Sequence, residues 1–208
     1  MAQTIQLKCG TFNLTRLLGK GKSGHSWLIE NGPLQYVLKR MHNEPCAYYQ
    51  FGDKLAAELA AYQRLQPLIN LPRLVEHSAE GKYLVKEYIP GPPVSELAAQ
   101  GAVPPGAFAQ LFRWCRALYP AGINLDYFPA NFVCTGKELF YVDYELNPYS
   151  EEWNFENWGL YYWLNAAGMR QFLSTGDHLA INLPGNKGKP ITAPFTTLAQ
   201  ETITKYRQ

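Results

Sequence analysis

The sequence is poor in charged residues. Only 17% of its 208 residues are Asp, Glu, Lys or Arg, and the formal net charge is +2. So small a net charge argues against a nucleic-acid-binding or membrane-binding surface. Histidine is rare, and the cysteines form no C-x-x-C pair, so the composition predicts neither a zinc site nor a disulfide framework. Reduced thiols in a reducing compartment are the simplest interpretation of Cys9, Cys46, Cys115 and Cys134.

The sequence also lacks long hydrophobic runs. None approaches the roughly 20 residues that cross a bilayer. The N-terminus has no basic region followed by an apolar core, and no internal repeat is visible. What is abundant is apolar side chain, at 47% of the residues, which is enough for a sizeable core. We therefore expect a soluble, cytoplasmic protein with one large domain or two small lobes.

The first part of the chain is predicted to be rich in β-structure. A helix is expected over about residues 48–69, where leucine and tyrosine recur at helical spacing. Around it, short alternating runs separated by turn residues predict strands in residues 11–19, 25–32 and 34–41, and two more within 73–89.

A break follows at the sequence PGPP, residues 90–93, because proline removes backbone donors and fixes the chain. Beyond it, apolar periodicity predicts helices within residues 104–122 and 151–173, and a short one at 196–207. The fold class is therefore α+β, with a β-rich lobe at 1–89, a hinge at 90–93 and a mainly helical lobe at 94–208.

Polar residues gather near a predicted β-hairpin. If Gly136 and Lys137 form a two-residue turn, Asn131 lies opposite Val142 and beside Asp143. Asp126 lies five residues before Asn131, in the same loop. An amide oxygen beside a carboxylate suits Mg²⁺, and a second carboxylate could accept a proton or orient a hydroxyl. The alternative is that Asp126 and Asn131 cap turns, which both residue types commonly do.

Residues 19–24 read GKGKSG, with Gly19, Gly21 and Gly24 in a G-x-G-x-x-G pattern. Glycines let a backbone approach a phosphate closely. A dinucleotide fingerprint would lead into a helix, whereas a strand is predicted here. A Walker A loop would need glycine at the position of Arg16, so that match is only partial. On its own, the pattern is also compatible with a flexible turn.

Lys39 follows in the predicted strand at 34–41, on the same face as two apolar residues. A lysine there usually reaches the surface. Within the next helix, Glu58 is a natural partner for it. The alternative for Glu58 is a surface pair with Lys54, four residues earlier.

The order of these motifs resembles the protein-kinase-like superfamily. D-x-x-P-x-N, a hairpin and then V-D-Y-E is similar to the kinase catalytic loop followed by its metal-binding aspartate. The resemblance covers about residues 15–165. It implies that Asp126 is the catalytic aspartate and that Asn131 and Asp143 are metal ligands. It also implies that the glycines cover phosphates and that Lys39, held by Glu58, positions them.

The segment YLVKEYIPG, residues 83–91, is similar to the kinase hinge. The resemblance implies that backbone groups of Glu87 and Ile89 bond an adenine edge. Lys86 would stand at the gatekeeper position, where lysine is unusual. The alternative is an ordinary strand end before a proline.

Other positions depart from the pattern of protein kinases. Asn124 and Leu125 replace the His-Arg pair, and Tyr144 and Glu145 follow Asp143 where Phe-Gly is usual. The sequence D-x-E looks more like aminoglycoside and choline phosphotransferases or lipopolysaccharide-type kinases. As a whole the chain also resembles Rio-type kinases. The resemblance thus implies an ATP- and Mg²⁺-dependent phosphotransferase acting on a hydroxyl of a small molecule, saccharide, lipid or protein. The alternatives are a non-catalytic pseudokinase and nucleotidyl transfer on the same fold.

Overall fold

The computed structural model describes residues 3–44, 52–136, 138–177, 181–185 and 188–207. Within this part of the chain the fold is mixed α and β, as the sequence predicts. The chain divides into two compact units. The first contains residues 1–64 and 71–89, and the second contains 65–70 and 90–208. Residues 65–70, which the sequence analysis assigned to the first lobe, therefore group with the second unit.

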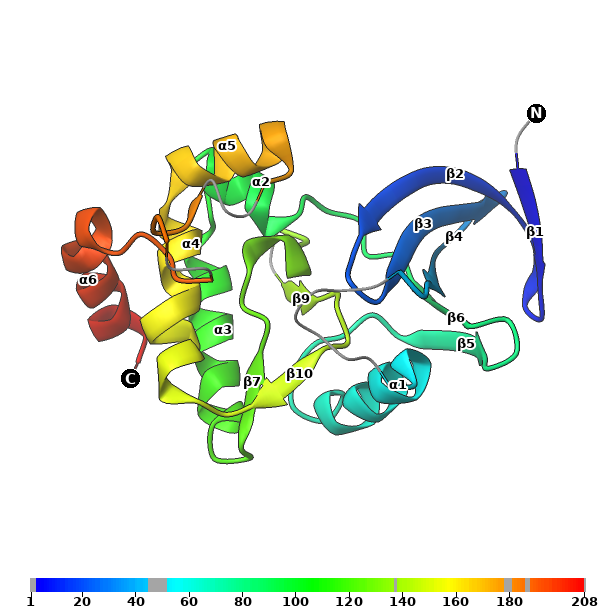
Figure 1. Ribbon diagram of the computed structural model, residues 1–208, viewed down its shortest axis with the longest axis horizontal. Coiled ribbons are helices and arrows are strands. Elements are labelled where there is room, and N and C mark those ends of the chain that lie inside the picture. Colours follow the sequence, from blue (N-terminus) through cyan, green and yellow to red (C-terminus); the bar gives the residue numbers. More distant parts are fainter. Residues whose placement is uncertain (1–2, 45–51, 137, 178–180, 186–187, 208) are drawn as a thin grey trace. The chain divides into compact units, whose positions relative to one another are not determined.

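The first unit is built on one curled antiparallel sheet of six strands (Figure 1). Neighbours within it follow the order β1-β2-β3-β4-β6-β5. Hairpins join β1 to β2, β2 to β3 and β3 to β4. The sequence predicted strands at the positions of β2, β3 and β4, but it did not predict β1. The strands are β1 (Gln3–Leu7), β2 (Gly10–Lys20), β3 (Gly24–Asn31), β4 (Leu34–Met41), β5 (Leu74–Ser78) and β6 (Tyr83–Glu87).

The two faces of this sheet differ in chemistry. One face carries an apolar cluster that includes Phe12, Ile29 and Leu38. Because side chains alternate along a strand, Lys39 points to the opposite face from Leu38. Lys39 is nevertheless buried. A charged group is thus held inside the unit on the face that does not carry the apolar cluster.

Among the described residues of the first unit there is one helix, α1, which runs from Lys54 to Leu65. The sequence predicted a longer helix over residues 48–69, of which 48–51 lie outside the described residues. At the C-terminal end the prediction is wrong, because Pro67 disfavours helical backbone at the residue before it. The buried positions Leu55, Glu58, Ala61 and Leu65 share one face of α1, so a carboxylate lies in its apolar stripe.

The second unit is mainly helical, with short strands near its polar loops. None of the helices described in either unit is both long and apolar enough to span a membrane. The helices are α2 (Val94–Ala99), α3 (Pro105–Leu118), α4 (Leu160–Leu164), α5 (Ala166–Thr175) and α6 (Thr196–Tyr206). The strands are β7 (Ile123–Leu125), β8 (Phe132–Cys134), β9 (Leu139–Tyr141) and β10 (Leu146–Pro148).

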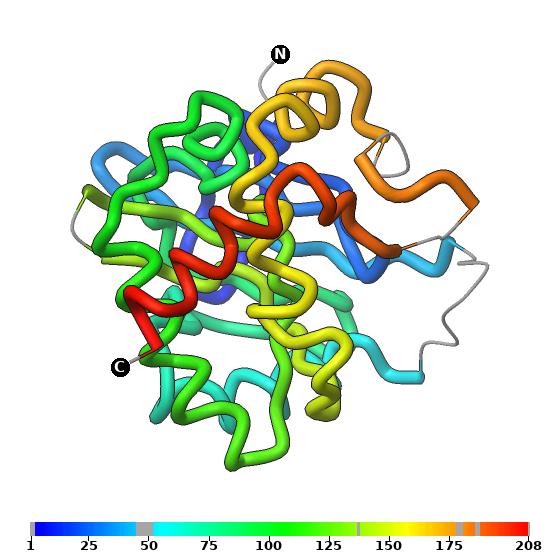
Figure 2. The backbone as a smooth tube through the Cα atoms, turned by 90° about the vertical axis from the view of Figure 1, so that its left-hand side faces the viewer, coloured from blue at the N-terminus to red at the C-terminus, as the bar shows by residue number. Residues whose placement is uncertain are grey.

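Helix α6 packs on α3 (Figure 2). The ring of Tyr206 stacks on Phe108 and Phe112, and Arg116 Nη1 donates a hydrogen bond to the carbonyl oxygen of Tyr206. The helix predicted at 196–207 is confirmed.

Most of residues 151–173 is helical, as predicted, but the helix is not continuous. The chain forms one 3-10 turn at Glu151–Trp153, then a π-helical turn at Phe155–Gly159 that runs into α4, and α5 starts separately. The breaks lie at Asn154 and Asn165, whose side chains accept hydrogen bonds from the N–H groups of Asn157 and Gly168. Asparagine competes in this way for backbone donors, so the helix restarts after each one.

The hairpin register is confirmed. Phe132 pairs with Tyr141 and Cys134 with Leu139, and the N–H of Val142 donates to the carbonyl oxygen of Asn131 at 2.9 Å. The predicted turn lies between these strands, and its residue 137 lies outside the described part of the chain. Asn131 and Val142 therefore stand side by side at the open end of the hairpin.

Candidate functional site

Lys39 and Glu58 form a buried ion pair in the first unit. Lys39 Nζ lies 2.5 Å from Glu58 Oε1, and the two side chains are 6% and 8% exposed. Strand β4 supplies the lysine and helix α1 the glutamate. Such a pair has low solvent screening, and loss of either partner would leave a buried charge. Glu58 Oε2 is also buried and has no protein hydrogen-bond partner among the described residues.

The glycine-rich stretch lies next to this ion pair and is linked to it by a hydrogen bond. Ser23 Oγ donates to Glu58 Oε1 at 2.8 Å, so one carboxylate oxygen serves both Ser23 and Lys39. Strands β2 and β3 flank the stretch and pair antiparallel. The strand that begins at Gly24 excludes the strand–turn–helix context of a dinucleotide fingerprint or a Walker A loop.

Two further side chains hold the tip of this loop. His42 Nε2 lies 3.0 Å from the carbonyl oxygen of Gly21, and Lys54 Nζ bonds the carbonyl oxygens of Lys22 and His42. The N–H of Gly21 donates to the carbonyl oxygen of Gly24 at 2.9 Å. The loop is therefore held as an ordered turn.

The three predicted phosphate-binding glycines have different surroundings. A Cβ atom on Gly24 would lie 2.5 Å from the carbonyl oxygen of Arg40, so this glycine is required by the packing of β3 on β4. A Cβ on Gly21 would make ordinary contact with the carbonyl of Gly24, and one on Gly19 would meet nothing within 4 Å. Only Gly19 and Gly21 are therefore free of a packing requirement.

The predicted adenine-binding segment lies at the end of β6. The N–H of Glu87 already donates to the carbonyl oxygen of Arg73 at 2.9 Å, so this donor is engaged within the protein. Ile89 is buried. Lys86 is buried too, and the pairing of Val37 with Lys86 and of Lys39 with Leu84 puts both lysines on one face of the sheet.

In the second unit, two strand pairs bring the predicted polar residues together. Strand β10 pairs with β7 so that Leu146 opposes Leu125, and the next positions along the pair are Glu145 and Asp126. The β8–β9 hairpin places Asn131 beside Val142, directly before Asp143. Directly opposed residues lie about 5 Å apart in antiparallel pairs. Both pairs therefore end at one polar cluster that holds Asp126, Asn131, Asp143 and Glu145, all half-buried.

Hydrogen bonds within the loop fix two members of this cluster. Asp126 Oδ1 accepts from the N–H of Phe128 at 3.1 Å, and Asn131 Nδ2 donates to the carbonyl oxygen of Asp126 at 3.2 Å. The turn-forming alternative is thus present for both residues.

Helix α4 and Gly159, the residue before it, pack against this loop. Trp163 Nε1 donates to the carbonyl oxygen of Tyr127 at 2.9 Å, and a Cβ on Gly159 would lie 2.4 Å from the Cβ of Tyr127. Tyr127 is fully buried, which fixes the backbone next to Asp126. The acidic side chain is therefore carried by a rigid element.

Tyr141 lies next to this polar cluster. Its fully buried hydroxyl donates to the carbonyl oxygen of Glu145 at 2.8 Å. Burial raises the pKa of Tyr141 well above its ordinary value, and the negative charges of Asp143, Asp126 and Glu145 raise it further. A backbone hydrogen bond from Asp126 acts in the opposite direction on this pKa. Tyr141 thus stays protonated and links the two segments that carry the acids.

Sequence reasoning did not assign Tyr141 or Glu145 to the site. Glu145 could have been found from the spacing D-x-E, which puts two carboxylates on one side of an extended chain. Tyr141 reads as an ordinary strand residue, and nothing in the sequence shows that its hydroxyl meets the loop of Asp126. The hydrogen bond of Tyr141 is visible only once the strand pairs β7–β10 and β8–β9 are known.

Comparisons with known proteins add no identity. No family model matches the chain, and no curated protein matches it significantly. The chemistry of the chain therefore has to be inferred from its own side chains and backbone groups. The first unit offers an ordered glycine turn and a buried ammonium group. The second offers carboxylate and amide oxygens of the kind that Mg²⁺ prefers.

Proposed function

We propose that the protein is an ATP-dependent phosphotransferase that transfers the γ-phosphoryl group of ATP to a hydroxyl. The buried Lys39–Glu58 pair beneath the glycine-rich turn is the observation that carries this proposal. The polar cluster at the ends of β7 and β9 supports it, because the same chain supplies the oxygen ligands and the carboxylate that the reaction needs. Each unit carries one part of that chemistry.

The ion pair is easier to explain by function than by stability. Desolvating two charges costs several kcal/mol per ion, and apolar residues of similar size often stabilise a protein as well or better. Glu58 holds the Lys39 ammonium group at a fixed place, and that group can bind phosphate oxygens. In this proposal the ammonium group positions the α- and β-phosphates and neutralises part of their charge.

The second unit supplies the metal ligands. Asn131 and Asp143 would hold Mg²⁺, and their amide and carboxylate oxygens fit its preference for oxygen ligands. Held there, Mg²⁺ would neutralise part of the charge that develops during transfer. The bond from Asn131 Nδ2 to the backbone of Asp126 fixes the plane of the amide and so the direction of its oxygen.

Asp126 would bind the acceptor. Its carboxylate orients the attacking hydroxyl and accepts its proton as the new O–P bond forms and the bond to the leaving oxygen of ADP breaks. The bond from the N–H of Phe128 to Asp126 Oδ1 holds this carboxylate in place. Catalysis is then mostly positioning and charge stabilisation.

A second candidate is a pseudokinase that binds nucleotide without transfer. Two contacts favour it: Asp126 Oδ1 is engaged in its own turn, and Ser23 ties the glycine turn to Glu58. Transfer of a nucleotidyl group on the same residues is a third candidate.

One experiment separates these functions. Protein and a pool of candidate acceptors are incubated with Mg²⁺ and ATP labelled on either the γ- or the α-phosphate, with Asp126→Asn as the blank. Phosphoryl transfer predicts γ-label in an acceptor for the wild type and none in the blank. Transfer of the α-label would indicate nucleotidyl transfer. No transfer of either label, with ATP still bound, would identify a pseudokinase.

A further inference from the structure

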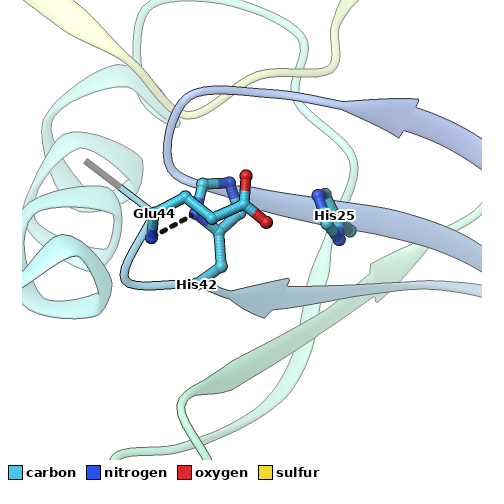
Figure 3. Close-up of side chains that lie close together, drawn as sticks. All are labelled: His25, His42 and Glu44. Carbon is cyan, nitrogen blue, oxygen red and sulfur yellow. Dashed lines mark hydrogen bonds between the residues drawn. The ribbon is translucent and has the colours of Figure 1, made fainter. Parts of the chain in front are cut away.

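Two of the four histidines of the sequence meet at the base of the glycine-rich turn (Figure 3). His25 is the second residue of β3, and His42 follows the last residue of β4. With Glu44 they offer one ligand atom each, and these three atoms lie within 4.8 Å of one another. The two imidazole centroids are 4.9 Å apart. Side chains from two strands and the following segment therefore converge on one point.

The hydrogen bonds of His42 prepare it as a ligand. Its Nε2 lies 3.0 Å from the carbonyl oxygen of Gly21, which requires a proton on Nε2 and leaves the lone pair on Nδ1. A histidine that binds a metal commonly donates its other N–H to a backbone carbonyl in this way. Nδ1 accepts only a long bond, 3.2 Å, from the N–H of Glu44, drawn in Figure 3.

We propose that His25, His42 and Glu44 form a binding site for a transition-metal dication of the Zn²⁺ class. Two imidazoles and one carboxylate are a donor set that Zn²⁺ uses, with the fourth position left to water. Ligand atoms in a tetrahedral zinc shell lie roughly 3.4 Å apart. Because the side chain of Glu44 is exposed, its rotation can close the larger separation seen without a metal.

The charges nearby select against oxygen-seeking cations. Arg40 pairs with His25 across the β3–β4 ladder, and the Lys54 ammonium group bonds the carbonyl oxygen of His42. Glu44 supplies the one negative charge among the three ligands. Mg²⁺ and Ca²⁺ depend on several oxygen ligands, so they would bind poorly here. Zn²⁺ gains directed bonds to imidazole nitrogen and tolerates that surrounding better.

The site joins both ends of the glycine-rich turn. His25 directly follows the turn. The ring of His42 holds the Gly21 carbonyl, and the backbone N–H of His42 donates to the Ser23 carbonyl oxygen. A bound metal would therefore fix the turn in its present form. This inference does not depend on the proposed phosphotransferase activity, because none of its three ligands has a role in that proposal.

Titration of the untagged protein with Co²⁺ and with Zn²⁺ tests the site. Visible absorption of tetrahedral Co²⁺ should appear with one metal per chain, and Zn²⁺ should displace it and raise the melting temperature. His25→Ala and Glu44→Gln should each weaken binding at least about tenfold. Neither variant removes the bond of His42 to Gly21, so both should fold.

His77→Ala and Cys9→Ser are the matched controls, since each removes another nitrogen or sulfur ligand. Each should bind Co²⁺ like the wild type. Absence of binding in the folded wild type would overturn the proposal, as would binding that survives in either His25→Ala or Glu44→Gln. Addition of Mg²⁺ in place of Zn²⁺ should leave the Co²⁺ spectrum unchanged, and displacement by Mg²⁺ would contradict the assigned metal class.

Discussion

At the scale of single residues, the proposed sites depend on three buried polar groups: the Lys39 ammonium, the Glu58 carboxylate and the Tyr141 hydroxyl. The sequence indicated the first two, because the order of lysine and glutamate after a glycine-rich stretch is readable. It gave no sign of the third, whose partners at Asp126 and Glu145 depend on two separate strand pairs. Contacts between segments distant in sequence are the part that local patterns do not contain.

The first prediction concerns the buried pair. Lys39→Met should lower the free energy of unfolding by about 3–5 kcal/mol, because the Glu58 carboxylate stays buried without its ammonium partner. The double variant Lys39→Met, Glu58→Leu should recover most of that loss. Urea denaturation followed by tryptophan fluorescence measures both. The exposed control Lys20→Met should change stability by less than about 0.5 kcal/mol. A loss in Lys39→Met as small as in this control would mean that the pair is not buried in solution.

The second prediction concerns Tyr141. Tyr141→Phe should fold and should lose about 1–3 kcal/mol of unfolding free energy, because the carbonyl of Glu145 and the N–H of Asp126 lose their buried partner. Its affinity for ATP with Mg²⁺ should fall as well. Tyr149→Phe, on an exposed tyrosine, serves as the control. If both variants bind Mg²⁺–ATP equally well, Tyr141 does not position the polar cluster.

At the scale of elements, the register of the hairpin and the positions of α3 and α6 were predictable, whereas the breaks within a helical stretch were not. The register of the β8–β9 hairpin followed from a two-residue turn, because one such assumption fixes every pair. The sequence did not predict the two breaks within residues 151–173, because apolar periodicity continues across Asn154 and Asn165. Capping by a side chain overrode the periodic pattern.

The third prediction separates packing from function in the glycine-rich turn. Gly24→Ala should be strongly destabilising, because its Cβ would collide with the Arg40 carbonyl. Gly19→Ala has space and should change the melting temperature little, while weakening nucleotide binding if this backbone approaches phosphate. Thermal denaturation with and without Mg²⁺–ATP measures both effects. Equal destabilisation by the two substitutions would contradict the assigned packing.

The fourth prediction concerns the β1–β2 hairpin, which is held by Glu76 of β5. The carboxylate accepts from the N–H groups of Lys8 and Cys9 and from the Tyr83 hydroxyl. Partial burial raises the pKa of Glu76, but these bonds outweigh it, so the pKa is below its ordinary value. A lowered pKa stabilises the fold above the unfolded-state pKa and loses this effect as the pH falls through the folded-state value.

Glu76→Gln should therefore cost on the order of 1 kcal/mol at pH 7, since the carboxylate stays partly hydrated. The difference from the wild type should shrink as the pH falls below about 4. Urea denaturation across this range measures this difference, with the exposed Glu80→Gln as the control.

The Glu76 carboxylate also acts on the thiol of Cys9. Burial of the sulfur, and then the hydrogen bond and negative charge of Glu76, raise the pKa of Cys9 to about 11. Alkylation of Cys9, followed by peptide mass spectrometry, should then be faster in Glu76→Gln; an unchanged rate would argue against the contact.

At the scale of the whole molecule, the sequence predicted the mixed α and β class and the β-rich character of the first part. It could not predict that residues 65–70 join the second unit, because that depends on a bond from the N–H of Tyr141 to the carbonyl of Asn70. Nor could it predict that His25 and His42 converge, since few histidines in a chain argue against a metal site by composition alone. The roles of the named site residues remain predictions.

Binding of ATP with and without Mg²⁺, measured by titration calorimetry, tests the central claim most directly. The wild type and Glu138→Gln, which removes an exposed acid of the same hairpin, should bind ATP in a Mg²⁺-dependent manner. Asp143→Asn should lose the Mg²⁺ dependence and bind at least about tenfold more weakly. Equal Mg²⁺-dependent affinity in Asp143→Asn and the wild type, or no ATP binding by the folded wild type, would contradict the account.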